Sequence, residues 1–218
     1  MTTNSPNPPS RPRGRPRKFD PEAAVATAQA LFLARGYDAL GVADLTEALG
    51  INPPSFYAAF GSKAGLFARV LERYSRCNGL PLDTLLHPGR PVDEALAALF
   101  EEAARRYAAG TADQGAADQG ATDQGVVDPG AAGCLVIEGQ RCDYPAARDA
   151  ASALNAIAVG AIRAFIAARH PEKAGALTDY LAAVLTGMST AARTGQDRER
   201  LLATAALAAR AVRSALAP

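Results

Sequence analysis

A series of short helical segments separated by glycines most constrains how this chain can fold. The segment Val42–Phe67 reads VADLTEALGINPPSFYAAFGSKAGLF. Gly50 is of the type that ends helices, and Asn52 is a preferred N-cap followed by proline at the first helical position. Gly61 and Ser62 repeat this stop and start. The pattern predicts two short helices joined by a tight turn and followed by a longer helix. This is a helix-turn-helix pattern, which can bind DNA, although many helical hairpins of this kind do not.

The rest of the chain also favours helices over strands. Hydrophobic residues make up 49% of the sequence, but much of that share is alanine, a strong helix former with little side chain to bury. Aromatic residues account for 6%, tryptophan is absent, and no stretch shows the alternation of a strand. The sequence therefore predicts an all-α protein of about nine helices, with an N-terminal three-helix helix-turn-helix domain and a C-terminal helical domain.

Caps and apolar spacing give the expected bounds of the other helices. Asp20 followed by proline starts the first helix, which ends at Gly36. In the C-terminal part, apolar residues recur at helical spacing in five segments. The five segments are 91–110, 133–141, 144–169, 171–194 and 197–216.

The net charge of +1 is unevenly distributed along the chain. Residues 1–18 carry five basic side chains and no acidic one, so the other 200 residues carry 18 basic and 22 acidic side chains, or −4. A basic tail on a mildly acidic body indicates contact with a polyanion at one end. Because this segment is rich in proline, serine and asparagine, we expect it to be disordered on its own.

Within this basic arm, the residues Arg13–Lys18 (RGRPRK) resemble the core of an AT-hook. Glycine and proline keep such a segment extended and thin, so its arginines can lie in a narrow A·T minor groove. Short basic arms beside helix-turn-helix units commonly bind in this way. The alternative is a solubilising tail that is attracted to phosphates in general.

The order and spacing of residues 19–67 resemble the DNA-binding domain of the TetR family of bacterial transcriptional regulators. The resemblance covers about 50 of the 218 residues without gaps. It implies that the third helix lies in the major groove, braced by the first and fourth helices. The matching groups are Ala30-Leu31-Phe32, Gly36-Tyr37, Val42-Ala43-Asp44-Leu45, Ala48-Leu49-Gly50-Ile51, Ser55-Phe56-Tyr57, Phe60-Gly61-Ser62-Lys63 and Leu66-Phe67.

The resemblance also implies that the start of the third helix faces the base edges. The prolines there can offer only apolar contact, for example to a thymine methyl group, whereas Ser55 can hydrogen-bond either as donor or as acceptor. Asn52 and Pro53 also serve simply to start the helix. Ala58 and Ala59 stand where family members often carry larger polar residues. We therefore expect DNA shape and the basic arm to contribute much of the specificity.

Three further residues are candidate contacts to the DNA backbone. Tyr57 follows a core position and should point outward, to a phosphate or a base edge. Lys63, in the first turn of the fourth helix, is expected to bind a phosphate, unless it is a solvated surface lysine. Thr46 is a weaker phosphate candidate. The predicted DNA-binding residues are thus Arg13, Arg15, Arg17, Lys18, Thr46, Asn52, Pro53, Pro54, Ser55, Tyr57 and Lys63.

The C-terminal region is expected to dimerise and to bind an effector. In TetR-like proteins the last two helices pair with their copies, and the apolar stripes of 171–194 and 197–216 fit this role, although both helices could instead only cover their own core. The resemblance also implies a small-molecule pocket whose ligand the sequence does not identify. Four pentapeptide units at 111–130 are interpreted as a flexible low-complexity insertion. The predicted domains are 1–18, 19–67 and 68–218.

Several classes of site are not indicated. The three cysteines and two histidines have no metal-ligand spacing, and reduced thiols without a secretory signal indicate a cytoplasmic protein. The longest uncharged apolar stretches, 150–162 and 180–192, fall short of the roughly 18 residues of a membrane span. Cys134, at a helix start, could have a lowered pKa and sense oxidants, or could be a buried small hydrophobe.

We therefore expect a ligand-responsive transcriptional regulator, most simply a repressor that binds a palindromic operator as a homodimer and is released by a small-molecule effector. The alternative is a DNA-architectural protein with little sequence preference. An enzyme is the remaining class. It is disfavoured because no nucleophile elbow, phosphate loop, metal cluster or catalytic carboxylate pair is recognisable, and no cofactor is expected.

Overall fold

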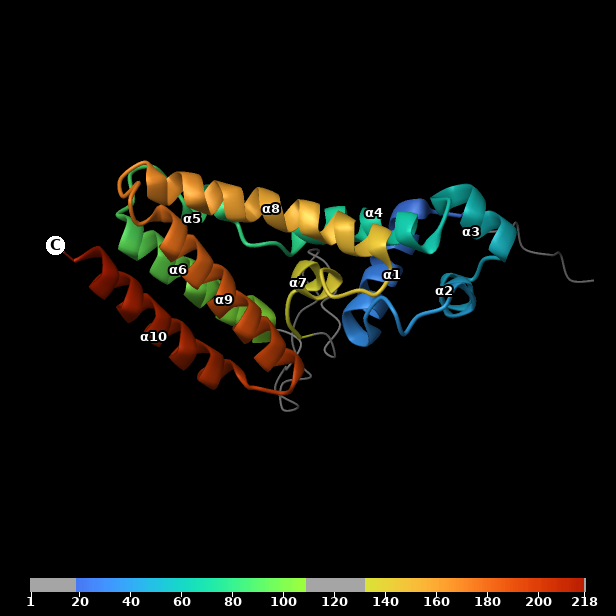
Figure 1. The fold of residues 1–218 in the computed structure, drawn as a ribbon. Helices are drawn as coiled ribbons and strands as arrows, with labels where there is room; N and C mark the ends of the chain where they lie inside the picture. Colours follow the sequence, from blue (N-terminus) through green and yellow to red (C-terminus); the bar gives the residue numbers. More distant parts are fainter. Residues whose placement is uncertain (1–18, 109–131, 218) are drawn as a thin grey trace, which may run out of the picture.

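The computed structural model describes residues 19–108 and 132–217. These residues form helices and no strand (Figure 1), so the all-α prediction is confirmed. The basic arm 1–18 and the repeats at 111–130 lie outside the described residues. The helices are α1 (Pro21–Arg35), α2 (Val42–Leu49), α3 (Pro53–Phe60), α4 (Lys63–Cys77), α5 (Leu82–Leu85), α6 (Val92–Tyr107), α7 (Leu135–Gly139), α8 (Pro145–Ala167), α9 (Ala174–Arg193) and α10 (Arg198–Leu216).

Local capping sets where the N-terminal helices begin, as the sequence predicts. The side chains of Asp20, Asn52 and Ser62 accept hydrogen bonds from backbone N–H groups in the first turns of α1, α3 and α4. Gly50 ends α2 with a φ of 64°, a left-handed conformation that favours glycine, and its N–H bonds back to carbonyls of α2. The turn between α2 and α3 is therefore specified by residues within it.

The N-terminal helices close around an aromatic core. Phe32, Phe56 and Phe67 are almost completely buried. The ring of Tyr37 lies against this group, with its centroid 4.9 Å from that of Phe67 and 5.8 Å from that of Phe32. The same cluster of buried residues continues into α7 and the beginning of α8. The helix-turn-helix unit therefore shares its core with the C-terminal part of the chain.

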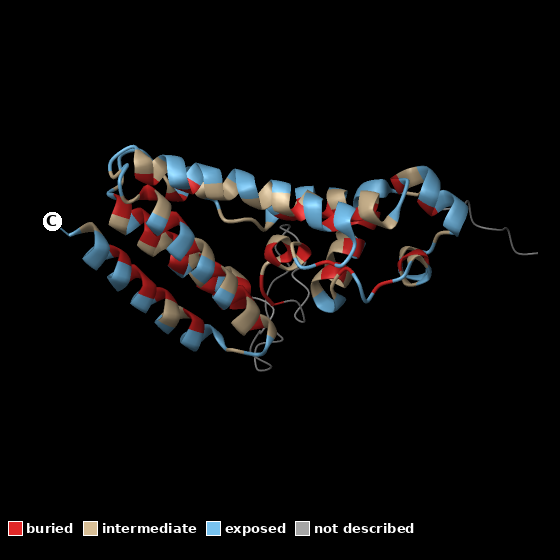
Figure 2. Ribbon diagram, viewed as in Figure 1, coloured by how far each residue is buried: buried red, intermediate tan, exposed pale blue. Residues whose placement is uncertain are grey.

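The C-terminal helices form an elongated bundle. In Figure 1, α8 runs along α4, and α9 lies between α8 and the pair formed by α6 and α10. The core of the bundle contains Leu96, Leu99 and Phe100 of α6, Leu181 of α9 and Val212 of α10. Burying each such side chain stabilises the fold by about 1.5–3 kcal/mol. Figure 2 shows buried residues on the inner faces of these helices and exposed residues on the outer faces of α8 and α10.

Some bounds differ from the sequence-based prediction. Residues 82–85 form a single helical turn, α5, which is not among the helical segments predicted from the sequence. The ninth helix starts at Ala174 rather than near residue 171, because a turn closed by the bond from the Lys173 N–H to the His170 carbonyl precedes it. The boundary expected between residues 67 and 68 falls inside α4, which continues without a break to Cys77. One rigid helix therefore connects the two parts.

Helix α8 is long and apolar. Among the described residues, it is the one helix long and apolar enough to cross a membrane by length and composition, with a mean hydropathy of 1.6 in its most apolar window. The uncharged stretch 150–162, which is too short for a span, lies within α8 between Asp149 and Arg163, and the 18-residue window that gives this hydropathy has at most two charged residues. In the fold α8 packs on α4, α7 and α9, and Ile157 on its outer face is 71% exposed.

Candidate nucleic-acid interface and effector cavity

The first turn of α3 is a solvent-facing edge of the N-terminal domain. Buried Phe56 and Phe60 hold the opposite side of α3 against the core. The side-chain oxygen of Asn52 accepts a hydrogen bond from the Ser55 N–H at 2.9 Å, so the side-chain NH2 group is what Asn52 can offer to DNA. The structure brings four predicted residues together at this edge, all of them exposed: Asn52, Pro53, Pro54 and Ser55.

Replacing Asn52 by alanine is expected to lower the free energy of unfolding by about 1 kcal/mol, because α3 loses its N-cap. Asn52→Ser is the matched control, since serine can cap the helix without the amide group. Denaturant unfolding of both variants measures the contribution of the cap to stability, and operator titration measures the contribution of the amide group to DNA binding. If the alanine variant is as stable as the parent protein, the cap contributes nothing.

Tyr57 also lies on the outer side of α3, as predicted. Its side chain is 52% exposed, and its ring stands edge-on to Phe56 with the centroids 5.5 Å apart. Arg69 of α4, which the sequence analysis did not single out, places its guanidinium carbon 5.6 Å from the centre of the Phe60 ring. It is exposed near the end of α3. The spacing of Arg69 in the sequence does not distinguish it from the other arginines of α4. Only the fold shows that Arg69 places a positive charge beside α3.

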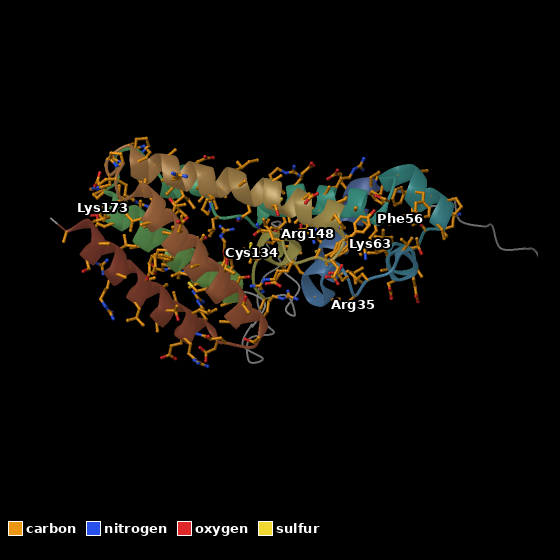
Figure 3. The ribbon with its side chains drawn as sticks, viewed as in Figure 1. Arg35, Phe56, Lys63, Cys134, Arg148 and Lys173 are labelled. Atoms are coloured by element: carbon orange, nitrogen blue, oxygen red, sulfur yellow. The ribbon has the colours of Figure 1, made fainter. Side chains whose placement is uncertain are left out.

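Lys63 stands in the first turn of α4, as predicted, but its ammonium group bonds inside the domain. Its ammonium group donates hydrogen bonds to the carbonyls of Tyr37 at 2.9 Å and Leu40 at 2.7 Å. The same nitrogen lies 3.9 Å from the centre of the Tyr37 ring. The pKa of Lys63 is lowered, mainly because its side chain is partly buried. Lys63 thus ties the start of α4 to the loop after α1, where Figure 3 labels it, and its charge is directed inward.

The predicted phosphate contact by Thr46 does not fit its position in the fold. Thr46 is 6% exposed, and its hydroxyl donates to the Ala43 carbonyl at 3.0 Å within α2. The predicted contacts Arg13, Arg15, Arg17 and Lys18 lie outside the described residues. The first described residue, Phe19, packs edge-on against Phe60 with ring centroids 6.1 Å apart. Residue 19 therefore stands beside the C-terminal end of α3.

Gly41 is the N-cap residue of α2 and has no side chain with which to cap the helix. The carboxylate of Asp44 accepts a hydrogen bond from the Gly41 N–H at 2.7 Å. This bond is the main reason why the pKa of Asp44 is lowered, and Arg35, 3.5 Å away, adds to it. The Asp44 side chain therefore takes up the N–H of Gly41 at the beginning of α2, although Gly41 has no side chain to contribute.

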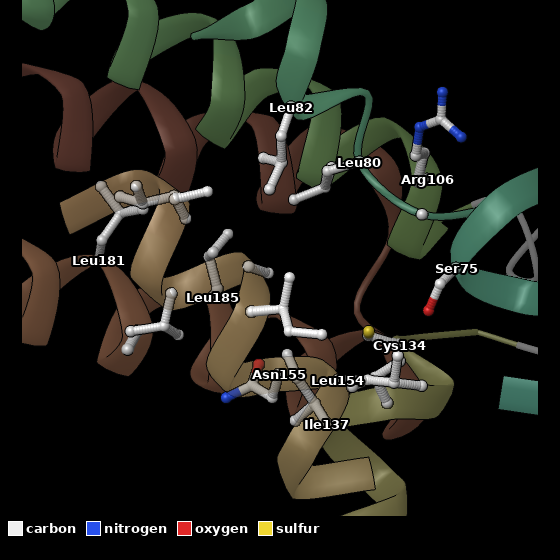
Figure 4. Close-up of a pocket in the computed structure, with 18 of the residues that line it drawn as sticks. Ser75, Leu80, Leu82, Arg106, Cys134, Ile137, Leu154, Asn155, Leu181 and Leu185 are labelled. Carbon is white, nitrogen blue, oxygen red and sulfur yellow. The ribbon is translucent and has the colours of Figure 1, made fainter. Parts of the chain in front are cut away.

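A cavity of about 360 Å³ lies in the C-terminal part, between α4, α5, α6, α7, α8 and α9. This volume is within the range of small-molecule sites. Leucines from several segments face one another across the cavity, and Cys134 stands at one end (Figure 4). No spacing rule in the sequence could have found this set of residues, because they come from six helices and two loops.

Cys134 does not have the electrostatics of an oxidant sensor. Burial raises the pKa of its thiol, although nearby N–H groups of α7 and the hydroxyls of Tyr74 and Tyr107 act in the opposite direction. The suggestion of a lowered pKa is therefore wrong. The backbone N–H of Cys134 donates to the Ser189 hydroxyl at 2.9 Å. Cys134 is thus a structural and cavity-lining residue, with its thiol in the protonated form.

Two hydrogen-bonded links connect the cavity region with α1. Arg106 donates to the Asn78 carbonyl at 3.3 Å, and the side chain of Asn78 accepts a bond from Gln29 of α1 at 3.0 Å. Both Arg106 and Asn78 line the cavity. Separately, Arg193 at the end of α9 donates to the Leu33 carbonyl of α1 at 3.0 Å. The lining of the cavity is therefore joined to α1 through Arg106, Asn78 and Gln29.

An exposed recognition-helix edge joined to a helical domain with an apolar cavity defines a helix-turn-helix regulator with a separate ligand site. Comparisons with known proteins agree. Residues 24–70 match the model of "Bacterial regulatory proteins, tetR family". The chain is 44% identical over 207 residues to the HTH-type transcriptional repressor BdcR of Escherichia coli (strain K12), covering 95% of this chain and 96% of BdcR.

Two further relatives extend the likeness to the whole fold. The HTH-type transcriptional repressor ComR of Escherichia coli (strain K12) is 30% identical, covering 93% of each chain. A cysteine mutant of the TetR family transcriptional regulator CifR, solved with 26bp double-strand operator DNA, is 33% identical. The likeness covers 90% of this chain and 99% of the CifR chain, with a TM-score of 0.73.

The chain belongs to the tetR family of bacterial regulatory proteins. The TetR resemblance and the transcriptional-regulator function expected from the sequence are thereby confirmed. The protein is a DNA-binding transcriptional regulator of the helix-turn-helix type. Dimerisation and response to a small-molecule effector are typical of its family.

Proposed function

We propose that this protein is a cytoplasmic repressor that binds a palindromic operator as a homodimer and leaves it when a ligand occupies the cavity. The observation that carries the proposal is the exposed first turn of α3, a short helix whose last residue, Phe60, packs against Phe19, the residue that follows the basic arm. A recognition helix reads base edges from its N-terminal end. The relatives BdcR and ComR are repressors, which supports repression rather than activation of transcription by this protein.

In this proposal two groups of residues contact the DNA. Asn52, the two prolines after it and Ser55 face the base edges, with Tyr57 and Arg69 on the flanking phosphates. The arm residues Arg13, Arg15, Arg17 and Lys18 enter the adjacent minor groove. Lys63 and Thr46 act as structural residues, since their polar groups are bonded inside the domain.

Dimerisation through α9 and α10 would supply the second recognition helix. Half-sites one helical turn apart require two such helices roughly 34 Å apart. The outer face of α10 carries Leu207, which is 58% exposed, together with exposed alanines that permit close helix approach. A second copy would bury this apolar surface.

Ligand response would use the links between the cavity and α1. Occupation of the cavity favours the arrangement of the dimer in which the two α3 helices no longer match the half-sites. Asn78 and Gln29 are suited to pass on this change, because Asn78 lines the cavity and bonds to α1. We further propose that the protein has no enzymatic role, in line with its regulator relatives.

A footprint on the DNA upstream of the gene for this protein tests the proposal. A discrete protected palindrome is the expected result. Diffuse protection without a sequence preference would favour the DNA-architectural alternative and overturn the repressor proposal. The same DNA placed before a reporter gene decides the direction of control, since deletion of the regulator should raise expression.

Tyr57→Phe is expected to weaken operator binding about tenfold, because the ring still packs on Phe56 while a hydrogen bond to a charged phosphate is lost. The matched control is Tyr144→Phe, which removes a hydroxyl with the same 52% side-chain exposure at the start of α8. Fluorescence anisotropy with labelled operator measures both. Equal effects of the two substitutions would remove Tyr57 from the interface.

A further inference from the structure

One end of the cavity carries a cluster of three polar side chains. Tyr74 of α4 and Tyr107 of α6 are both buried, and their hydroxyls interact with the thiol of Cys134. Backbone N–H groups of Val136 and Ile137 also point to the sulfur of Cys134. A tyrosine hydroxyl that donates its hydrogen to this sulfur keeps oxygen lone pairs that can accept another hydrogen bond.

One of the two tyrosine oxygens already accepts a backbone bond. The N–H of Leu135 donates to the Tyr74 oxygen. Burial raises the pKa of both tyrosines well above the usual range, so both hydroxyls stay protonated. Tyr107, which is 3% exposed and lines the cavity, is thus suited to accept a hydrogen bond from a ligand.

The remaining walls are mostly apolar, although Asn155 of α8 and Thr178 and Thr186 of α9 also line them. Leucines of α8, α9 and the loop after α4 enclose the centre of the cavity, as Figure 4 shows for Leu80, Leu82, Leu154, Leu181 and Leu185. Burial of an apolar ligand body against them is favourable by about 25 cal/mol for each Å² removed from water. A volume of about 360 Å³ admits a body of two fused rings.

The charged side chains at the cavity do not favour an anion. Arg106 is held by Glu102, with the Nε–Oε1 distance at 2.6 Å, and by the Asn78 carbonyl. Its guanidinium is directed away from the leucines in Figure 4. The other charged side chain among the described lining residues is Asp83, which is exposed on α5. A carboxylate ligand would lose its hydration without gaining an unpaired cation.

We propose that the effector of this cavity is an uncharged molecule with an apolar body and one hydroxyl group, and that this hydroxyl donates to Tyr107. The inference rests on the proposed function, in which this cavity is the effector site. The leucine walls contact the apolar body of the ligand, and the end of the cavity that contains Tyr74, Tyr107 and Cys134 binds its hydroxyl group.

Three probes with one ring system test this ligand class on the full chain. The probes are 2-naphthol, 2-methoxynaphthalene, which has no donor, and 2-naphthoate, which carries a charge. Calorimetric titration at neutral pH is expected to show 2-naphthol binding roughly tenfold more tightly than either of the others. Equal or tighter binding of 2-naphthoate would overturn the proposal.

Tyr107→Phe is the decisive variant. It is expected to weaken 2-naphthol binding roughly tenfold and to leave 2-methoxynaphthalene binding unchanged, which also reports that the cavity is still folded. An unchanged preference for 2-naphthol in this variant would overturn the assignment of Tyr107. Should the substitution prevent folding, the order of affinities of the three probes for the unaltered chain still decides the ligand class.

Operator titration of the same ligand-free samples separates the two proposals. If the protein does not bind the operator, the proposed function fails regardless of the probes. If it binds the operator but shows no preference among the probes, only the ligand class fails.

Discussion

Deletion of residues 1–18 is expected to weaken operator binding about a hundredfold at physiological salt and to flatten its salt dependence. The segment carries five basic side chains, and each phosphate contact contributes roughly 0.9 to the slope of log affinity against log salt. If all five take part, the slope falls by about 4.5. The position of Phe19 against Phe60 starts the arm beside α3, so it is well placed to reach the adjacent groove.

Anisotropy titrations over a series of salt concentrations measure this effect. The matched control keeps the length of the arm and replaces its five basic residues by glutamine, which should reproduce the loss. Operators with A·T or G·C pairs beside the half-sites distinguish minor-groove binding from a general attraction to phosphate. An unchanged affinity and slope in the truncated protein would contradict the role of the arm.

Lys63→Met is expected to lower the free energy of unfolding by about 2–3 kcal/mol. The substitution keeps the aliphatic stem but leaves the Tyr37 and Leu40 carbonyls without their shared donor. It also removes the ammonium group from the face of the Tyr37 ring. The expected loss in the free energy of unfolding is no larger than this because Lys63 is only partly buried.

Denaturant unfolding of the full chain measures the effect, with Lys173→Met as the control. Lys173, at the far end of the molecule in Figure 3, makes one exposed bond of 3.4 Å to the Ala217 carbonyl. Its replacement should change stability by less than about 0.5 kcal/mol. Folded Lys63→Met protein should keep the salt dependence of operator binding. A slope reduced by about one would instead restore Lys63 as a phosphate contact.

Much of the N-terminal domain could be predicted because its signals are local. Asn52 caps α3 and Gly50 ends α2 through bonds that span only a few residues, so the residue types and their order are sufficient. The exposure of Tyr57 followed from its place next to buried Phe56 on a helix. The TetR resemblance rests on the same local order.

The roles of Lys63 and Thr46 could not be predicted in this way. Both stand where a contact with phosphate is reasonable by position along their helices. What decides their roles is where the chain places other groups in space, namely two carbonyls 26 and 23 residues before Lys63 and the packed surroundings of Thr46. Sequence spacing carries no information about such distant partners.

The sequence by itself thus determined most of the helices, the N-terminal caps, the helix-turn-helix unit and the basic arm, since each depends on interactions between near neighbours in the chain. Only the tertiary structure decided that Lys63 acts inside the domain, that Cys134 joins two tyrosines at the end of a cavity, and that Asn78 connects this cavity to α1. These features bring together residues far apart in the sequence, and their energies depend on burial and distance.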